Sequence, residues 1–339
     1  MSNKSLLGVG IIFILFFTVS CHRHKADEER YAKMPPELAA LYIKIDKHPS
    51  DPVLYAKLSD YYLKTSVMDS ALNAILTAIR LDSSKSDFYL KLSDVYFAMN
   101  NIDASEEMLD KVIAMDAKNQ EAYLKLAELH FLHKRYKEAH ETIDKVLEID
   151  TYNPKAYFIR AWVYRKEGDT TAAIRSYLTA VDQKNDYYEA YEELALLYHH
   201  KKDPTVINYY KNALNIKPNN TQIMYNLAMF YQETGDFDKA ILYYKMIIQI
   251  DPSHKYALHN IGWIYLVKMQ KYDEAVAFFT KAINVDNNYL EAIYNRGLAF
   301  ESLKKYNNAR QDYEYTLKLN DKYQVAIEGL NRLDKLQKN

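Results

Sequence analysis

Glycine, proline and cysteine are scarce in this sequence. Its 339 residues include 7 Gly, 8 Pro and 1 Cys, so glycine and proline both fall below half of their average shares of roughly 7% and 5%. Gly-rich phosphate loops, dinucleotide-binding turns and hairpin-rich β folds need glycines that are missing here. A single cysteine excludes an intrachain disulfide bond and a Cys-based zinc site. An all-helical protein is the class that remains.

An excess of charge of one sign is also missing. The sequence has 44 Lys and Arg against 45 Asp and Glu, which gives a formal net charge of −1. Nucleic acid binding needs a concentrated basic face, so we expect no nucleic acid partner. Hydrophobic residues make up 49% of the chain, which is enough to bury a core.

A short apolar run lies near the N-terminus. Residues 6–17 are apolar, whereas a membrane span needs about 20 such residues, so we interpret residues 1–20 as a secretory signal peptide. The end of this segment, with Ser20 before the only cysteine, resembles the lipobox of bacterial lipoproteins. The resemblance implies that Cys21 becomes lipid-modified and anchors the mature chain to a membrane, with residues 21–34 as a charged tether. Two alternatives remain: an uncleaved signal anchor, or cleavage with Cys21 merely nearby.

Tyrosine recurs every 34 residues through the first half of the chain. The series is Tyr55, Tyr89, Tyr123, Tyr157 and Tyr191. A small residue follows four positions after each: Ser59, Ser93, Ala127, Ala161 and Ala195. A second series consists mainly of alanine and continues to the end of the chain: Ala71, Ser105, Ala139, Ala173, Val206, Ala240, Ala275 and Ala309. A period this long and regular indicates a repeat protein.

This pattern resembles the tetratricopeptide repeat (TPR), a helix–turn–helix unit of 34 residues. Eight repeats cover residues 52–323, starting at positions 52, 86, 120, 154, 188, 221, 255 and 290; residues are numbered 1–34 within each repeat. The fifth repeat is one residue short and the seventh one residue long, and we expect both changes in the turn between the paired helices. The resemblance implies an all-α, right-handed superhelical solenoid. We expect capping helices at residues 35–48 and 324–339.

The physical chemistry of packing agrees with this family pattern. Small residues at positions 8 and 20 let two antiparallel helices approach closely, and large residues at positions 4, 7, 11 and 24 fill the space beside them. No repeat can bury its apolar face alone, so stability comes from stacking. Gly168 and Gly235 fall between paired helices, where we expect a left-handed backbone conformation.

The resemblance also implies that positions 2, 5, 6, 9, 12 and 13 line a concave groove. In the first three repeats position 6 is lysine: Lys57, Lys91 and Lys125. Position 9 is acidic in the same repeats: Asp60, Asp94 and Glu128. The two charges of each repeat are spaced i, i+3, so they can pair on their own helix. Alternatively, the lysines are available to a carboxylate-bearing partner.

From the fourth repeat onward the groove positions change in character. The apolar and aromatic candidates are Phe158, Trp162, Leu196, Tyr225, Met229, Trp263, Tyr294 and Leu298. Asparagine occupies position 6 in the last three repeats: Asn226, Asn260 and Asn295. Exposed aromatic side chains are common binding anchors, and a primary amide can both donate to and accept from a peptide backbone. We therefore predict a peptide- or protein-binding groove here, the alternative being contacts with the adjacent helix or with the chain's own ends.

No catalytic, cofactor-binding or metal-binding residues are expected. P-loop, Gly-x-Ser-x-Gly and His-Glu-x-x-His strings do not occur in the sequence. His130 stands where the repeat favours Tyr, so we expect it to be a packed core residue. The sequence thus predicts a non-enzymatic, lipid-anchored scaffold that binds proteins, within a secretion or assembly complex of the bacterial envelope. We place it at the outer membrane, on its periplasmic side or surface, in preference to the inner membrane.

Two other functions stay open at this point. One is an accessory subunit of an envelope enzyme that processes peptidoglycan or carbohydrate. The other is a self-assembling structural protein that uses exposed tyrosines such as Tyr209, Tyr243 and Tyr315.

Overall fold

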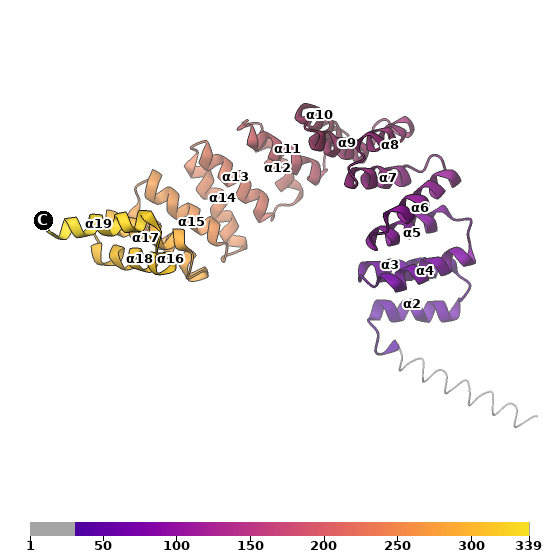
Figure 1. Cartoon of the computed structure of the whole chain (residues 1–339), viewed down its shortest axis with the longest axis horizontal. Coiled ribbons are helices and arrows are strands. Elements are labelled where there is room, and N and C mark those ends of the chain that lie inside the picture. The colour runs from indigo at the N-terminus through magenta and orange to yellow at the C-terminus, as the bar shows by residue number, and fades with distance from the viewer. Residues whose placement is uncertain (1–30, 339) are drawn as a thin grey trace, which may run out of the picture. The chain divides into compact units, whose positions relative to one another are not determined.

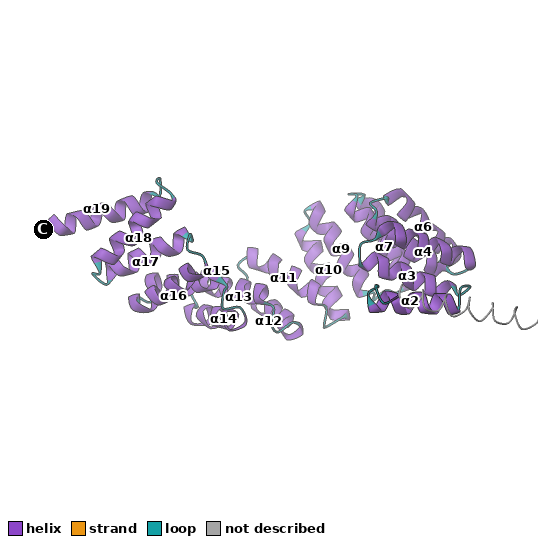
Figure 2. Ribbon diagram, turned by 90° about the horizontal axis from the view of Figure 1, so that it is seen from below, coloured by secondary structure: helices purple, strands orange, loops and turns teal. Residues whose placement is uncertain are grey.

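The computed structural model describes residues 31–338. The expected signal peptide, Cys21 and the first part of the tether therefore lie outside the described residues. Within residues 31–338 the secondary structure is entirely helical, with 18 α-helices that pack in helix–turn–helix pairs, as Figures 1 and 2 show. The all-α repeat architecture predicted from the sequence is confirmed.

The chain divides into two compact units, Met1–Gly168 and Asp169–Asn339, called here the N-terminal and C-terminal units. The boundary falls between the two helices of the fourth repeat. The N-terminal unit contains α2 (Pro36–Lys47), α3 (Pro52–Lys64), α4 (Met68–Leu81), α5 (Ser86–Ala98), α6 (Ile102–Met115), α7 (Gln120–Leu132), α8 (Tyr136–Ile149) and α9 (Pro154–Glu167). The C-terminal unit contains α10 (Thr170–Gln183), α11 (Tyr188–His200), α12 (Val206–Ile216), α13 (Thr221–Glu233), α14 (Phe237–Ile250), α15 (Lys255–Trp263), η1 (Ile264–Lys268), α16 (Tyr272–Val285), α17 (Leu290–Ser302), α18 (Tyr306–Leu319) and α19 (Gln324–Lys338).

The repeated small and large residues form the core of each unit. Every position-8 and position-20 residue is buried. Position 24 of the second helix is fully buried in each of the eight repeats: Ile75, Leu109, Ile143, Tyr177, Tyr210, Tyr244, Phe279 and Tyr313. His130, at position 11 of the third repeat, is buried as predicted. The helices are therefore held by the apolar series that recurs along the sequence.

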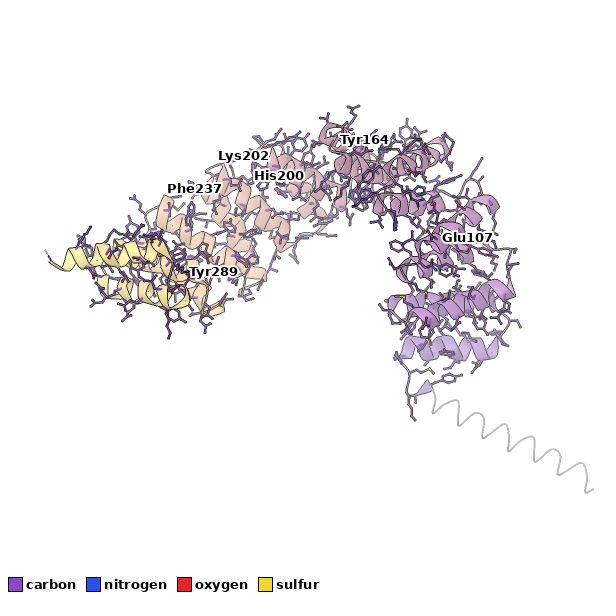
Figure 3. The ribbon with its side chains drawn as sticks, in the orientation of Figure 1. Glu107, Tyr164, His200, Lys202, Phe237 and Tyr289 are labelled. Carbon is purple, nitrogen blue, oxygen red and sulfur yellow. The ribbon has the colours of Figure 1, made fainter. Side chains whose placement is uncertain are left out.

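The turns between paired helices explain why so few glycines suffice. Gly168 and Gly235 adopt left-handed backbone angles, with φ of 90° and 85°, as predicted. The other six repeats place a residue with a side chain in the same conformation: Ser66, Asn100, Lys134, Lys202, Gln270 and Lys304. Figure 3 labels Lys202 in the turn after α11. A left-handed residue with a Cβ costs roughly 1–2 kcal/mol, so these turns depend on the surrounding helices.

Aspartate side chains bond the backbone of most loops between repeats. The side chain of Asp82 accepts a hydrogen bond from the backbone N–H of Ser84, at 3.0 Å. The same bond, from a residue to the N–H two positions later, recurs at Asp116, Asp150, Asp251, Asp286 and Asn320. Such turns satisfy backbone donors locally. This regularity accounts for loops that are short and nearly free of glycine.

The two length changes are accommodated differently. In the fifth repeat the deletion lies in the turn, where Pro204 and Thr205 precede α12, the shortest second helix. The extra residue of the seventh repeat is not in the turn, so that expectation is wrong. It forms the π-helical segment η1 at the end of α15, and Gln270 keeps the left-handed turn. Single π-turns are the usual way for a helix to absorb one inserted residue.

The end helices pack on the outermost repeats. Ile45 of α2 contacts a cluster containing Leu54 and Leu58 of α3, while Ala326 and Leu333 of α19 cover Tyr313 of α18. Among residues 31–338 no helix is both long and apolar enough to cross a membrane.

Candidate protein-binding surfaces

Groove charges in the N-terminal unit pair between repeats, and not along one helix as the i, i+3 spacing suggested. Lys91 of α5 lies 3.0 Å from Asp60 of α3, and Lys125 of α7 lies 2.7 Å from Asp94 of α5. The first helices of neighbouring repeats lie side by side, so position 6 of one repeat meets position 9 of the previous one. The ion pair with the acidic partner raises the pKa of Lys91 against the opposing effect of its burial. These lysines are engaged within the protein.

A pocket opens between α5 and α7, above α6. Its volume is about 240 Å³, and it is lined by Ser93, Asp94, Phe97, Ser105, Leu109, Lys125, Glu128, Leu129 and Leu132. Phe97 and Leu132 stand at groove positions 12 and 13 and expose 45% and 55% of their surface. Glu128, at one side, pairs with Lys155 at 2.9 Å. This α5–α7 pocket combines an apolar rim with fixed charges, which suits an amphipathic peptide.

The predicted anchor Trp162 is held between two phenylalanines. Its ring stacks on Phe131 of α7 at a centroid distance of 5.5 Å and contacts Phe158 at 4.7 Å. Phe158 is only 6% exposed, so position 5 serves the packing between repeats, as Leu90 and Leu124 do at the same position. Trp162 is half-buried, with its ring fixed on both sides.

Three of the predicted residues in the C-terminal unit form one cluster around Asn260. Its amide nitrogen lies 3.1 Å from the hydroxyl of Tyr225 and 3.0 Å from the hydroxyl of Tyr244, with the sulfur of Met229 at 3.5 Å. Burial raises the pKa of Tyr225, so this hydroxyl stays protonated. Asn260 can bond a peptide backbone only by giving up these contacts.

The remaining predicted residues of the C-terminal unit are half-buried. Asn226 accepts a hydrogen bond from Gln222 at 3.0 Å. Trp263 packs on the core of the seventh repeat, with the ammonium of Lys268 at 5.5 Å from its ring. The structure also places three further candidates on this series of first helices: Leu196, Tyr294 and Leu298.

His259 is a groove residue that sequence reasoning missed. It stands at position 5 of the seventh repeat and links two of the predicted amides: its Nδ1 lies 3.2 Å from Oδ1 of Asn260, and its Nε2 lies 3.1 Å from Nδ2 of Asn295. Its ring also contacts Tyr289, which Figure 3 labels, at 5.2 Å. Burial lowers the pKa of His259. Listing position 5 in every repeat would have found it, since that position is large and apolar in most others.

Polar side chains at position 12 serve buried tyrosines. The hydroxyl of Tyr210 meets His199 at 2.8 Å, that of Tyr244 donates to Gln232 at 3.1 Å, and that of Tyr313 donates to Glu301 at 2.5 Å. Phe279, which has no hydroxyl, packs with an apolar position-12 residue, Leu266. In these three repeats of the C-terminal unit the side chain at position 12 therefore serves as the hydrogen-bond partner of the buried tyrosine at position 24. In the N-terminal unit position 12 carries the exposed Phe97.

No group of three or more His, Cys, Asp or Glu within residues 31–338 could hold a metal ion. His130 lies 3.3 Å from Glu106 and 3.2 Å from Thr142. Arg135 also binds Glu106, and this contact holds the pKa of Glu106 below its ordinary value. The histidine is thus part of a packed polar group between α6, α7 and α8.

Comparison with known families identifies the repeat. Models of the tetratricopeptide repeat match residues 90–154 and 160–206, residues 220–288 and residues 290–323, more than half of the chain together. The chain belongs to the tetratricopeptide repeat family, whose repeats act as protein-binding scaffolds.

Individual relatives share parts of this chain. Photosystem I assembly protein Ycf3 from Rippkaea orientalis is 30% identical over 39% of this chain and 71% of that protein. Serine/threonine-protein phosphatase 5 from Rattus norvegicus is 32% identical over 27% of this chain, and the match spans only 19% of the phosphatase. The solved C-terminal part of a TPR repeat-containing protein from Cytophaga hutchinsonii has a TM-score of 0.61 at 17% identity, covering 71% of this chain and 99% of that one. This last likeness shows a shared fold.

Proposed function

We propose that this chain is a non-enzymatic, lipid-anchored scaffold of the bacterial envelope, which holds segments of partner proteins along its groove within a secretion or assembly complex. The α5–α7 pocket is the observation that carries the binding role. Its rim residues Phe97 and Leu132 are exposed, while the Asp94–Lys125 ion pair at 2.7 Å gives it fixed polar groups. An apolar side chain of a peptide can fill the pocket while its backbone bonds the charged groups.

The predicted residues of the later repeats supply further binding surfaces, separate in each unit, in this proposal. Trp162, Trp263, Tyr225 and Tyr294 are half-buried, so one part of each ring is fixed by neighbours and another part faces outward. Rings that are already immobile lose little entropy when a ligand contacts them. In the N-terminal unit, Phe158 contributes by packing against the ring of Trp162.

A role in assembly is consistent with one relative. The Rippkaea orientalis protein is named as an assembly protein of photosystem I. This relative supports only a general scaffolding role for the chain, because photosystem I is named as the target of the Rippkaea orientalis protein alone.

Pull-down from solubilised membranes tests the groove. Phe97→Ala/Leu132→Ala and Trp162→Ala/Trp263→Ala are compared with the wild type and with Tyr152→Ala, which removes an exposed ring from a loop between repeats. We expect the first double variant to lose partners, the second to weaken their binding, and the loop variant to behave as wild type. Retention of every partner at unchanged affinity by both double variants contradicts groove binding.

The anchor is tested separately. Replacing Cys21 by Ser removes the only thiol in the chain, so the variant is expected to move from the membrane fraction to the soluble fraction. Membranes are washed with high salt first, because a bound partner can also retain the protein. A variant that stays in washed membranes contradicts lipid anchoring while leaving groove binding untouched.

A further inference from the structure

Helix α2, the first helix among the described elements, occupies the place of the second helix of a repeat. Four residues, 48–51, separate α2 from α3, and four residues, 82–85, separate α4 from α5. Ile45 and Leu41 of α2 pack on α3, as a second helix packs on the next repeat. The first helix that would complete this repeat is not among the described elements.

Among residues 31–338 no first helix covers this side of α3. In the following repeats position 10 is covered by the previous repeat: Val95 packs in a cluster with residues of α3 and α4, and Leu129 packs against Leu90 of α5. Tyr61, at position 10 of α3, is only half-buried. Lys57, at position 6, is exposed, whereas Lys91 and Lys125 are half-buried at that position.

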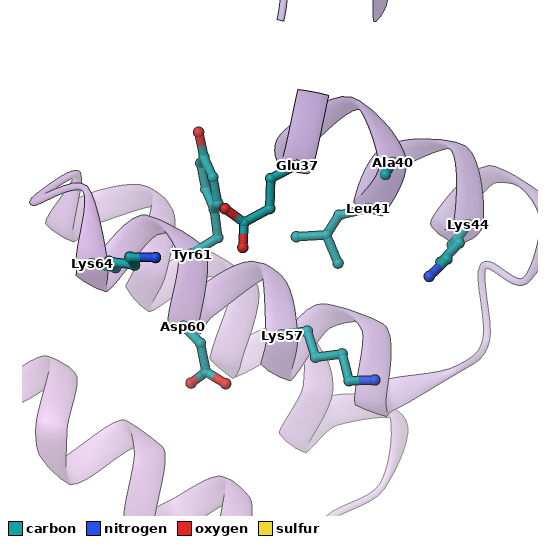
Figure 4. Close-up of a pocket in the computed structure, with 8 residues that line it drawn as sticks. All are labelled: Glu37, Ala40, Leu41, Lys44, Lys57, Asp60, Tyr61 and Lys64. Atoms are coloured by element: carbon teal, nitrogen blue, oxygen red, sulfur yellow. The ribbon is translucent and has the colours of Figure 1, made fainter. Parts of the chain in front are cut away.

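A pocket of about 370 Å³ lies at this side of α3. Its lining residues are Glu37, Ala40, Leu41, Lys44, Lys57, Asp60, Tyr61 and Lys64, and Figure 4 shows them on α2 and α3. The floor is formed by the apolar parts of Leu41 and Tyr61. We call this the α2–α3 pocket.

The charge of the α2–α3 pocket is unbalanced. Lys44, Lys57 and Lys64 form no ion pair within the described residues. Asp60 accepts two hydrogen bonds from Lys91 of the next repeat, at 3.1 and 3.0 Å, so its charge is already neutralised. Three lysines therefore face a single other carboxylate, that of Glu37.

We propose that the α2–α3 pocket binds an acidic amphipathic helix of a partner protein, which takes the position that the first helix of the previous repeat has in the following repeats. The helix places a carboxylate opposite Lys57, as Asp60 stands opposite Lys91 and Asp94 opposite Lys125. Its apolar side chains cover Leu41 and Tyr61, and further acidic residues meet Lys44 and Lys64. The partner thus adds one repeat to the N-terminal end, in a helix-in-groove mode.

Charge argues against a second copy of this chain as the occupant. The unpaired first helix at the other end is α19, which carries Arg332, Lys335 and Lys338 against Glu328 and Asp334. Arg332 stands at position 9 and already binds Glu301 of α17 at 2.9 Å. Stacking α19 on α3 would therefore offer Lys57 no carboxylate at the place where Asp60 and Asp94 serve the next repeats.

Calorimetric titration of the full chain tests this proposal with a synthetic probe. The probe is a helix-forming peptide with Leu on one face and Glu beside it, and the matched peptide carries Lys in place of each Glu. We expect the acidic peptide to bind, more weakly as salt rises, and the basic peptide not to bind. Lys57→Glu should weaken the acidic peptide at least about tenfold. Lys118→Glu, the same charge change in a loop away from the pocket, should have no effect.

Charge reversal gives the sharper result. The peptide with one Lys opposite position 57 should bind Lys57→Glu more tightly than wild type. Three outcomes overturn the proposal: equal effects of the two Lys→Glu variants, self-association of the chain that Lys57→Glu abolishes, and binding that appears only after residues 22–30 are deleted. The last would make the chain's own segment the occupant. Circular dichroism verifies that each variant is folded.

Discussion

The two units build the same helix pairs from different side chains. In the first three repeats position 24 is aliphatic and position 8 is Ser or Ala, and both are buried. In the last two repeats a ring fills position 24, and glycine faces it: a Cβ on Gly262 would lie 2.8 Å from the ring of Phe279, and one on Gly297 would lie 2.9 Å from the ring of Tyr313. Ring with glycine is thus the packing solution of the last two repeats, and aliphatic residue with Ser or Ala that of the first three; repeats four to six combine a ring with Ala.

The difference extends into the groove. Buried hydroxyls need partners, so the C-terminal unit devotes polar groove residues such as Gln232 and Glu301 to its own tyrosines. The N-terminal unit has no such hydroxyls at position 24, and Phe97 at position 12 stays exposed. A polar residue in a groove is therefore not by itself a binding residue. The polar groove of the C-terminal unit is in large part structural.

Exchanging the two packing solutions should give the largest effect. Gly262→Ala forces a Cβ against Phe279, and overpacking of this kind costs about 1–3 kcal/mol. In the double variant with Phe279→Leu, the repeat acquires the combination of Ala or Ser with an aliphatic residue found in the N-terminal unit. We expect the double variant to lose less stability than the sum of the two single changes, measured by urea denaturation. Strictly additive losses would show that the two positions are independent.

Removing a buried hydroxyl should have the next largest effect. Tyr244→Phe removes the hydroxyl that Gln232 and Asn260 both contact. Losing such hydrogen bonds lowers the free energy of unfolding by about 1–2 kcal/mol. The opposite change in the next repeat, Phe279→Tyr, buries a hydroxyl beside Leu266 and should also destabilise. Adding Leu266→Gln should restore part of the loss, since it recreates the position-12 partner. If the added amide brings no recovery, the link between positions 12 and 24 is wrong.

The sequence predicts features that are set within a single repeat and misses contacts between neighbouring repeats. Burial at positions 8, 20 and 24 and the left-handed Gly168 and Gly235 follow from the pattern of a single repeat. The pairing of Lys91 with Asp60 needs the register between repeats, which the 34-residue period does not contain. The sequence suggested that the amide of Asn260 is free to bind a peptide backbone. In the structure the hydroxyls of Tyr225 and Tyr244 contact this amide, and they come from other helices, so the pattern of one repeat does not reveal them. The π-turn of η1 was missed because repeat length alone does not locate an insertion.

Acid should weaken the C-terminal unit through His259. Burial holds its pKa below the ordinary value of 6.5, and the weaker effect of Glu291 opposes this. The unfolded chain binds a proton near pH 6.5 while the folded chain does not, so stability is complete above pH 6.5 and falls as pH drops toward the folded pKa. Protonation at Nε2 would also set two donors, the imidazolium and the amide of Asn295, against each other.

The variant His259→Gln isolates this contribution. Glutamine keeps an amide within reach of Asn260 and Asn295 and does not titrate. We expect the difference in unfolding free energy between wild type and variant to favour wild type less at pH 5 than at pH 8. A difference that is constant across this range would show that His259 binds protons equally in both states. The comparison cancels the other histidines, which both proteins share.

Breaking the ion pairs between position 6 of one repeat and position 9 of the previous one should have the smallest effect, and these pairs lie in the N-terminal unit. Lys125→Gln removes the bond to Asp94, and both side chains are partly exposed, so we expect a loss of about 0.5 kcal/mol. The loss should shrink at high salt because exposed charges are screened. Asp94→Asn should give the same loss, and the double variant little more, since each removes the same pair. In the C-terminal unit the corresponding change, Asn260→Ala, removes uncharged contacts, so its larger cost should not depend on salt.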